Sequence, residues 1–324
     1  MKTSELKYKS SQMVWPKAPY NFGATVFKPS HYPDLTKVYE PDKYWFPLRF
    51  RGGIYGVKLI NRGTVNKPKI QLFIFSNKPQ NKKGIQDIIT EVSYRFEFNH
   101  DISEFNKKFK KDKVLGPFIK RLRGMRMNCA YDLYGLLMIG IFLQNTVVRR
   151  TVQMTNSMLS EYGAKVRFDN KEMFCFWKPE EMMKVPEQDL RVLKVGYRAK
   201  LFIKTSKTFV KEKIDEFVLR RMPREEIKKE LLKIYGVGPE TARILLEECF
   251  HSRGVFEHVA PWQQKIYSHL LFNKKLVPAK KIVRYIQKNW GEWATLASHY
   301  IWEDIFWQRK NGKKIEWLER EIRL

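Results

Sequence analysis

Apolar residues change their spacing along the chain near residue 99. Before that point, short runs rich in aromatic and β-branched side chains alternate with glycine, asparagine and proline, which is typical of strands joined by turns. The runs predict strands at residues 44–51, 53–61 and 69–76, followed by a helix at 85–95. We therefore expect an antiparallel sheet that has one solvated face. The helix is expected to pack on this sheet.

Beyond residue 99 the apolar positions recur about every 3.6 residues, which is the period of an amphipathic helix. Helices are predicted at residues 102–109, 114–122, 132–162, 179–183, 189–210, 224–235, 239–250, 262–272, 278–289 and 292–306. The predicted fold class is therefore α+β. It consists of a small mixed β domain with an N-terminal antiparallel sheet at 1–100 and an all-helical domain at 101–324. The boundary between them is expected between residues 78 and 105.

The charge balance indicates what kind of partner the protein binds. The chain has 324 residues, enough for two domains, and its 62 Lys and Arg against 34 Asp and Glu give a formal net charge of +28. An enzyme for small neutral substrates has no need of such an excess, whereas a partner made of phosphates does. The basic residues are spread along the whole chain, so this is a basic protein throughout rather than a neutral protein with a basic tail.

Composition also argues against several other classes. The three cysteines, Cys129, Cys175 and Cys249, are too few and too scattered for a disulfide framework, a zinc site or an iron–sulfur cluster. The six histidines form no HxxxH pair, so no metal site is predicted. The most apolar stretch, residues 136–143, is too short to cross a bilayer, and the N-terminus does not resemble a signal peptide. We expect an intracellular protein, cytoplasmic and associated with the nucleoid if the source is prokaryotic.

The sharpest local pattern is the turn Gly236-Val237-Gly238-Pro239 between two predicted helices, which together span residues 224–250. Proline is favourable at the first position of a helix, where the missing N–H has no intrahelical acceptor. The two glycines lack side chains, so a DNA backbone can approach the free N–H groups at the helix N-terminus. An ordinary glycine-capped helical hairpin is the alternative, but the high positive charge favours phosphate binding.

This hairpin resembles the helix–hairpin–helix of the DNA glycosylase superfamily. Other segments, in the same order, resemble its 3-methyladenine DNA glycosylase II branch and the related 8-oxoguanine glycosylases, so the resemblance covers most of the chain. The N-terminal sheet is similar to their small β domain. Residues 136–151 are similar to a long helix that faces the gap in DNA, 190–204 to their Gly-Tyr-Arg helix, and 292–307 to their C-terminal helix.

The resemblance implies a mechanism, and this sequence departs from the family pattern at two positions. In the family a base is flipped out of the duplex, and an Asp carboxylate stabilises the positive charge that develops on the sugar. Bifunctional members add a lysine amine that forms a Schiff base. Glu240 stands at the position of that lysine, which implies a monofunctional glycosylase. Ala260 stands at the position of the aspartate, so this chain is predicted to be inactive as written.

Three interpretations of Ala260 remain open from the sequence. The aspartate could have been replaced deliberately to trap a stable DNA complex, or the chain could be a natural relative that binds damaged DNA without cleaving it. A neighbouring group, Glu257 or His258, could instead take over the catalytic role. As ordinary loop residues, these two side chains would be a solvated acid and a polar group bonded to the backbone.

The resemblance also implies DNA and base contacts. Gln144 and Asn145 would fill the hole left by the flipped nucleotide, which their position and the family favour over buried amides satisfied by the neighbouring helical turn. Phosphate contacts are expected from Gly236, Val237, Gly238, Glu240, Thr241, Arg149 and Lys265. The base pocket is expected to include Phe22, Trp262, Tyr300 and Trp302, although aromatic residues are more often plain core.

The predicted function is that of a base-excision-repair DNA glycosylase that flips and hydrolytically removes a damaged purine, with an alkylated purine as the expected substrate. The alternatives are an 8-oxoguanine glycosylase and a non-catalytic relative that binds damaged DNA. The expected partner is double-stranded DNA with a damaged base, bound by a monomer away from any membrane. No cofactor is expected, apart from a structural monovalent cation at the hairpin.

Overall fold

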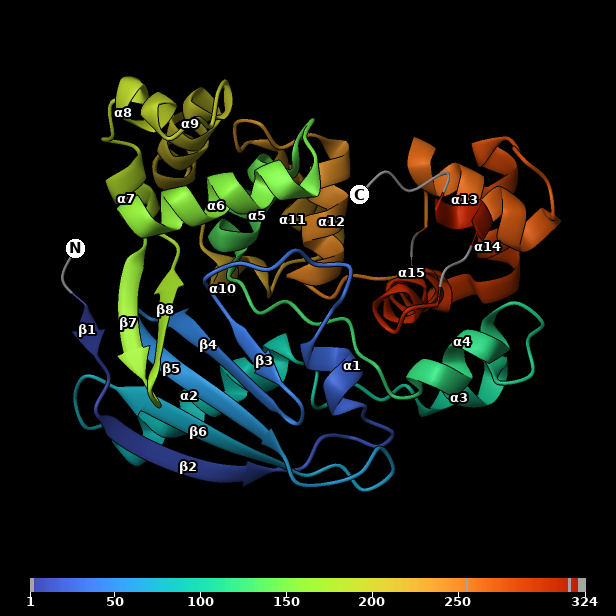
Figure 1. Cartoon of the computed structure of the whole chain (residues 1–324), viewed down its shortest axis with the longest axis horizontal. Helices are drawn as coiled ribbons and strands as arrows, with labels where there is room; N and C mark the ends of the chain where they lie inside the picture. The colour runs from blue at the N-terminus through green and yellow to red at the C-terminus, as the bar shows by residue number, and fades with distance from the viewer. Residues whose placement is uncertain (1–2, 255, 314–315, 320–324) are drawn as a thin grey trace.

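The computed structural model describes residues 3–254, 256–313 and 316–319 and is an α+β fold (Figure 1). Its larger sheet has the strand order β2-β6-β5-β4-β3, and all neighbouring strands are antiparallel. The strands are β2 (Tyr8–Val14), β3 (Val38–Glu40), β4 (Lys43–Phe50), β5 (Gly53–Asn61) and β6 (Ile70–Ser76). The three strands predicted from the sequence are confirmed as β4, β5 and β6, and two edge strands extend the sheet.

Helix α2 (Lys82–Arg95) confirms the predicted helix that follows the sheet. It begins at Asn81, whose side chain accepts a hydrogen bond from the Gly84 N–H. Its apolar residues Ile88, Ile89 and Val92 are buried in one cluster with the sheet residues of β4, β5 and β6. This packing gives the N-terminal part of the chain a core of its own.

A second sheet joins distant parts of the chain in the order β1-β7-β8. Its strands are β1 (Ser4–Glu5), β7 (Ala164–Phe168) and β8 (Lys171–Cys175). Strands β7 and β8 interrupt the part of the chain that the sequence predicted to be all-helical. Between them Asp169 and Asn170 both have positive φ, at 48° and 60°, as a tight hairpin turn requires. The strands have only five residues each, so their alternation is too short to stand out in the sequence.

The helices form two separate hydrophobic cores. The first core takes almost all its residues from 129–250, and the second from 102–127 together with 256–318. The helices of the first core region are α5 (Leu133–Leu143), α6 (Val148–Tyr162), α7 (Pro179–Met182), α8 (Glu187–Val192), α9 (Arg198–Lys211), α10 (Glu216–Leu219), α11 (Arg224–Leu232) and α12 (Pro239–Glu248). Those of the second are α3 (Ser103–Phe109), α4 (Leu115–Leu122), α13 (Pro261–Phe272), α14 (Ala279–Trp290), α15 (Ala294–Lys310) and α16 (Glu316–Glu319).

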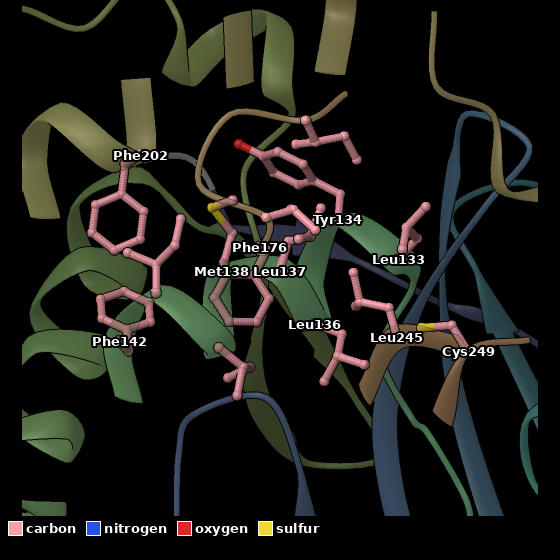
Figure 2. Packing of buried hydrophobic residues seen from close by; sticks show 14 of the residues in the cluster. Leu133, Tyr134, Leu136, Leu137, Met138, Phe142, Phe176, Phe202, Leu245 and Cys249 are labelled. Carbon is pink, nitrogen blue, oxygen red and sulfur yellow. The ribbon is translucent and has the colours of Figure 1, made fainter. Parts of the chain in front are cut away.

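Figure 2 shows the first core, where Leu245 of α12 and Cys249, directly after α12, lie beside Leu133 and Leu136 of α5. Helix α5 is apolar around its whole circumference, as expected of a helix buried on all sides. Within the described residues, no helix is long and apolar enough to cross a membrane. The short helix α1 (Phe22–Val26) lies where the sheet domain meets the second core (Figure 1).

A buried ion-pair network connects the sheet domain to the first helical core. The Arg220 guanidinium, next to α10, forms two hydrogen bonds to the Glu91 carboxylate on α2, at 2.6 and 2.8 Å, and also pairs with Glu216. Arg95 binds the same Glu91 carboxylate at 2.6 Å. Glu216 in turn accepts a hydrogen bond of 2.7 Å from the N–H of Leu133, at the start of α5. The four charged groups therefore fix the position of α5 relative to the sheet.

Candidate nucleic-acid interface

The predicted helical hairpin is present and its turn is at the surface. Gly236 is exposed and has φ of +84°, a conformation that favours glycine. Val237 is buried between the two helices, and α12 begins with Pro239 directly after Gly238. A Cβ at Gly238 would meet no atom within 4 Å, so the space in front of it is open. The turn therefore exposes backbone to an incoming ligand.

The N-terminus of α12 is a suitable place for a phosphate oxygen. The Ala242 N–H donates a 2.9 Å hydrogen bond to the Gly238 carbonyl, at the start of the helical ladder. Glu240 and Thr241 precede Ala242 in the helix, so their N–H groups have no intrahelical acceptor. These donors and the helix dipole favour an anion at this end of α12.

Glu240 is neutralised locally by Arg243 on the next turn of α12. Their side chains form two hydrogen bonds, at 2.6 and 3.0 Å, and Arg243 also binds Glu247 at 2.7 Å. Burial raises the pKa of Glu240, but the hydrogen bond and charge of Arg243, with a contribution from His258, lower it overall. The carboxylate at the position of the lyase lysine is thus an ion-pair partner.

Gln144 and Asn145 do not lie inside a helix, and this corrects the prediction of one continuous helix at 132–162. Helix α5 ends at Leu143, α6 begins at Val148, and Asn145 has φ of 45° in the turn between them. In this turn the Gln144 carbonyl accepts a hydrogen bond from Arg198 of α9 instead of from the next helical turn. Leu143 and Val147, which flank the turn, are 48% and 61% exposed, so the turn projects from the protein.

Helix α9 links this projecting turn to the hairpin. At its N-terminus, the Tyr197 hydroxyl lies 3.5 Å from the Asn145 side-chain amide. Two turns later, the Thr205 hydroxyl donates a 2.8 Å hydrogen bond to the Tyr235 carbonyl. The sequence predicted one helix at 189–210, but α8 and α9 are separated by Lys194 and Gly196, both with positive φ. We call the turn at 144–147, the N-terminal part of α9 and the hairpin turn the α9 surface.

Two predicted contact residues lie at the surface on α6 and α13. Arg149 is exposed on the first turn of α6, and Lys265 is exposed on α13. The neighbouring Arg150 donates a hydrogen bond to the Lys194 carbonyl, so it holds α6 to the loop before α9. Sequence reasoning does not separate these two adjacent arginines, because only the structure reveals which one has a backbone acceptor.

Ala260 is the residue that precedes α13. Its N–H donates a 3.2 Å hydrogen bond to the Gln263 side chain, but the Ala260 methyl group cannot accept a bond from the helix in return. Glu257 and His258 are exposed in the loop before it. His258 influences the pKa of Glu240, which places this loop close to the start of α12. The loop and the hairpin are therefore neighbours.

The aromatic residues expected in a base pocket are mostly part of the cores. Phe22 is 4% exposed in the core of the sheet domain, and Tyr300 is fully buried with its hydroxyl bonded to the Met125 carbonyl at 3.1 Å. Neither ring offers a face to a flipped base in this structure. Trp302 is half-buried and packs edge-on against Phe306. The backbone of Trp262 is part of α13, and its side chain lies outside what the structure describes.

Sequence reasoning missed a buried polar cluster where α1, α12 and α15 meet. Lys28 is 5% exposed, and its amine lies 2.7 Å from the Arg126 carbonyl and 3.1 Å from the His299 ring. Burial lowers the pKa of Lys28 to about 8, although Glu303 opposes the shift. Burial also raises the pKa of Glu248 to about 7, with Glu303 adding to the shift. No spacing motif connects residues so far apart in the sequence.

Glu97 anchors the segment that leads to the loop at 256–260. Its carboxylate, which is 1% exposed, pairs with Arg253 and accepts a 3.2 Å hydrogen bond from His100. Burial alone would raise the pKa of Glu97, but the charge of Arg253 and the His100 hydrogen bond hold it well below its usual range. The free energy of this ion pair is therefore linked to pH.

We expect Glu97→Gln to destabilise the protein at pH 7 and to lose part of this effect in acid. A carboxylate with a lowered folded pKa contributes its full stability above the ordinary pKa of 4.5, and this contribution decreases progressively as pH falls from 4.5 toward the lower folded pKa. Urea unfolding from pH 7 to about 3 measures the difference between variant and parent chain. Glu161→Gln, at an exposed residue of α6, is the control and should show a small, constant difference. A Glu97→Gln difference that did not shrink in acid would contradict the assignment.

A bound metal is not needed to explain these groups. Within the described residues, no group of three or more His, Cys, Asp or Glu side chains is arranged to hold a metal ion. In the hairpin turn, the Ile234 carbonyl accepts a bond from the Val237 N–H, and the Tyr235 carbonyl accepts one from Thr205. A monovalent cation there would have to share oxygens that already have donors.

Comparisons with known proteins agree with the family resemblance. No family model matches the chain. A protein named DNA-3-methyladenine glycosylase from Bacillus subtilis (strain 168) is 22% identical over 245 residues, which cover 74% of this chain and 80% of that protein. The chain also matches a probable N-glycosylase/DNA lyase of Methanothermobacter thermautotrophicus at 24% identity, over 65% of this chain and 72% of that protein.

Among solved structures, the 3-methyladenine DNA glycosylase from Archaeoglobus fulgidus superposes with a TM-score of 0.74 at 16% identity, over 91% of this chain and 99% of that one. At such identities the likeness establishes the fold. The resemblance of the hairpin, sheet and C-terminal helix to this group is thus confirmed for the architecture of nearly the whole chain.

Proposed function

We propose that this chain, which has the fold of the helix–hairpin–helix DNA glycosylases, binds duplex DNA at a damaged base and serves base-excision repair. The observation that carries the proposal is the α9 surface, on which one helix contacts both the exposed hairpin turn and the projecting turn at 144–147. The hairpin would hold a phosphate, and Gln144 and Asn145 would enter the space of a flipped nucleotide. The relatives named as DNA glycosylases and the charge of +28 support the same partner.

We infer a monofunctional, hydrolytic type of chemistry. A Schiff-base mechanism needs an amine, and Glu240 offers a carboxylate that is already bound to Arg243. In the form with an aspartate at 260, the carboxylate would lie at the N-terminus of α13 and stabilise positive charge on the sugar. The chain with Ala260 lacks that group, so we propose that it binds damaged DNA and releases bases poorly. It would act as a monomer and without a chemical cofactor.

An alkylated purine is the proposed lesion, supported by the name of the Bacillus subtilis relative. Oxidised guanine is the second candidate, because the probable N-glycosylase/DNA lyase of Methanothermobacter thermautotrophicus also matches the chain. A third candidate, a non-catalytic binder of damaged DNA, is favoured by one observation, the methyl side chain at position 260. A monovalent cation at the hairpin would only assist phosphate binding and takes no part in these alternatives.

The direct test is binding to a duplex that contains a stable abasic-site analogue, compared with the undamaged duplex. We expect tighter binding to the damaged duplex, with affinity falling steeply between about 50 and 200 mM salt because phosphate contacts release counterions. Equal affinity for both duplexes would reject damage recognition. An affinity that does not respond to salt would reject phosphate binding altogether.

Gly238→Asp should weaken binding to every duplex by about 10- to 100-fold without loss of stability. The residue has φ of −94° and directly precedes α12, where aspartate is a favourable helix cap, so the fold accommodates it. The new carboxylate would face the phosphate and repel it. Fluorescence anisotropy and thermal unfolding measure the two effects.

Gly238→Ser is the matched control for that variant. Serine also caps a helix but carries no charge, so its stability should equal that of Gly238→Asp while its affinity stays closer to that of the parent chain. If the aspartate variant bound DNA as tightly as the serine variant, the turn would be an ordinary helical hairpin with no role in binding.

A further inference from the structure

A second basic feature lies outside the α9 surface, beside α3 and α4. It is a groove of about 910 Å³, which we call the α3–α4 groove. Five of the residues that line it are exposed lysines: Lys107, Lys110, Lys111, Lys113 and Lys120. Figure 1 shows α3 and α4 next to α15 and away from the hairpin helices α11 and α12. The groove therefore belongs to the second helical core, whereas the hairpin belongs to the first.

The charge of these lysines is not balanced within the groove. Asp112 is the one acidic residue in its described lining, and a single oxygen of its carboxylate accepts hydrogen bonds from the Val114 and Leu115 N–H groups at 2.8 and 2.7 Å. This carboxylate is directed at the start of α4. In the part of the chain that the structure describes, none of the five lysines forms an ion pair. Arg121, by contrast, binds Asp304 of α15 with two hydrogen bonds.

The helices and the turn that carry the lysines are tightly packed. A Cβ at Gly116 would lie 2.9 Å from the Lys110 carbonyl, so the chain between α3 and α4 packs tightly against the first turn of α4. Phe105, Phe109 and Phe118 of the same two helices are buried in the second core. Holding several like charges in fixed positions costs free energy, and an anionic partner relieves this repulsion.

We propose that the α3–α4 groove binds the sugar–phosphate backbone of duplex DNA beyond the segment held by the hairpin. The inference rests on the proposed function and extends it to the flanking duplex. Five amines spread along two helices and the turn between them fit a row of phosphates better than one compact anion, and a duplex offers one charge for about every 1.7 Å of its axis. Lysine amines bind such charges without reading the base sequence.

The test varies duplex length together with groove charge. The parent chain and the triple variant Lys107→Glu, Lys110→Glu and Lys111→Glu are titrated with duplexes of about 12 and about 30 base pairs, each with the same central abasic-site analogue. The parent should bind the longer duplex at least ~10-fold more tightly, and the variant should lose most of that gain while it binds the short duplex normally. The slope of the salt dependence on the long duplex should fall by about 0.9 for each phosphate that the variant no longer binds.

One control variant and the short duplex make the outcomes distinct. Lys78→Glu, Lys82→Glu and Lys83→Glu, exposed residues at or before the start of α2, remove the same net charge and should keep the length dependence. If this control lost the length dependence equally, the groove proposal would be overturned. The same would follow if the groove variant lost affinity equally for both duplex lengths. If the parent chain bound the short duplex and bound the longer one no more tightly, the groove proposal would be overturned and the proposed function would stand. A parent chain that binds neither duplex overturns both.

Discussion

Replacing Ala260 by aspartate is expected to raise the release of free base from alkylated duplex DNA by at least ~100-fold over the parent chain. The reason is electrostatic, since a carboxylate before α13 would stabilise the positive charge that forms on the sugar when the bond to the base breaks. The loop lies near the hairpin, and Gln263 already holds the Ala260 N–H. Chromatography of the released base measures the effect.

The same replacement should also stabilise the protein. Ala260 directly precedes α13 and cannot accept a hydrogen bond from the helix, whereas aspartate there can, and such caps contribute about 0.5–2 kcal/mol. The helix dipole favours the ionised form. The gain should therefore be present at pH 7 and fade as pH falls below about 4, where the carboxyl group takes up a proton.

Ala260→Asn separates the two effects of Ala260→Asp. Asparagine caps the helix as well as aspartate does, but it is neutral, so it should stabilise the fold and leave base release unchanged. If Ala260→Asp gained stability and still released no base, the chain would be a non-catalytic binder. If the parent chain released base and became inactive on Glu257→Gln or His258→Ala, one of those neighbours would carry the reaction.

Arg220→Met should lower the free energy of unfolding by about 3–5 kcal/mol, the largest loss we expect from one substitution. Arg220 is the only bidentate partner of Glu91 in the described residues, and Glu216 depends on it as well. Methionine would leave two buried carboxylates without that positive charge. Because Glu216 also holds the start of α5, the damage would extend from the sheet domain to the first helical core.

Arg191→Met is the matched control for Arg220→Met. Arg191 also forms two hydrogen bonds with one glutamate, Glu187, four residues earlier on α8, although both end on a single carboxylate oxygen, and both side chains are exposed. Exposed pairs contribute about 0–1 kcal/mol, so this variant should unfold almost as the parent does in urea. Similar losses in both variants would mean that burial does not govern the strength of the network.

The parts of the fold that were predictable from sequence have strong local signals. Strands β4, β5 and β6 combine aromatic and β-branched runs with clear turns, and the hairpin combines two glycines with a proline at the helix start. The architecture of nearly the whole chain followed from the order of the segments in the family resemblance. In each case neighbouring residues, or a known order of segments, carried the information.

The parts that were missed depend on residues far apart in the sequence. In the break after Leu143, Arg198 binds the Gln144 carbonyl, and the buried Lys28 contacts His299 from the other end of the chain. An apolar run through residue 143 looks like the first part of a longer helix until that arginine is in place. Likewise, the burial of Tyr300 could not be separated from a pocket role, because an aromatic ring serves both.

The division of the helices into two cores has a consequence for biosynthesis. Helices α3 and α4 leave the ribosome early, yet the surface that covers Phe105, Phe109 and Phe118 comes from residues after 256. The segment at 129–250 can fold before the last helices are synthesised, because its core draws almost entirely on its own residues. Until the last helices are synthesised, the nascent chain must carry an uncovered aromatic patch, and the lysines of the adjoining turn would keep that patch hydrated.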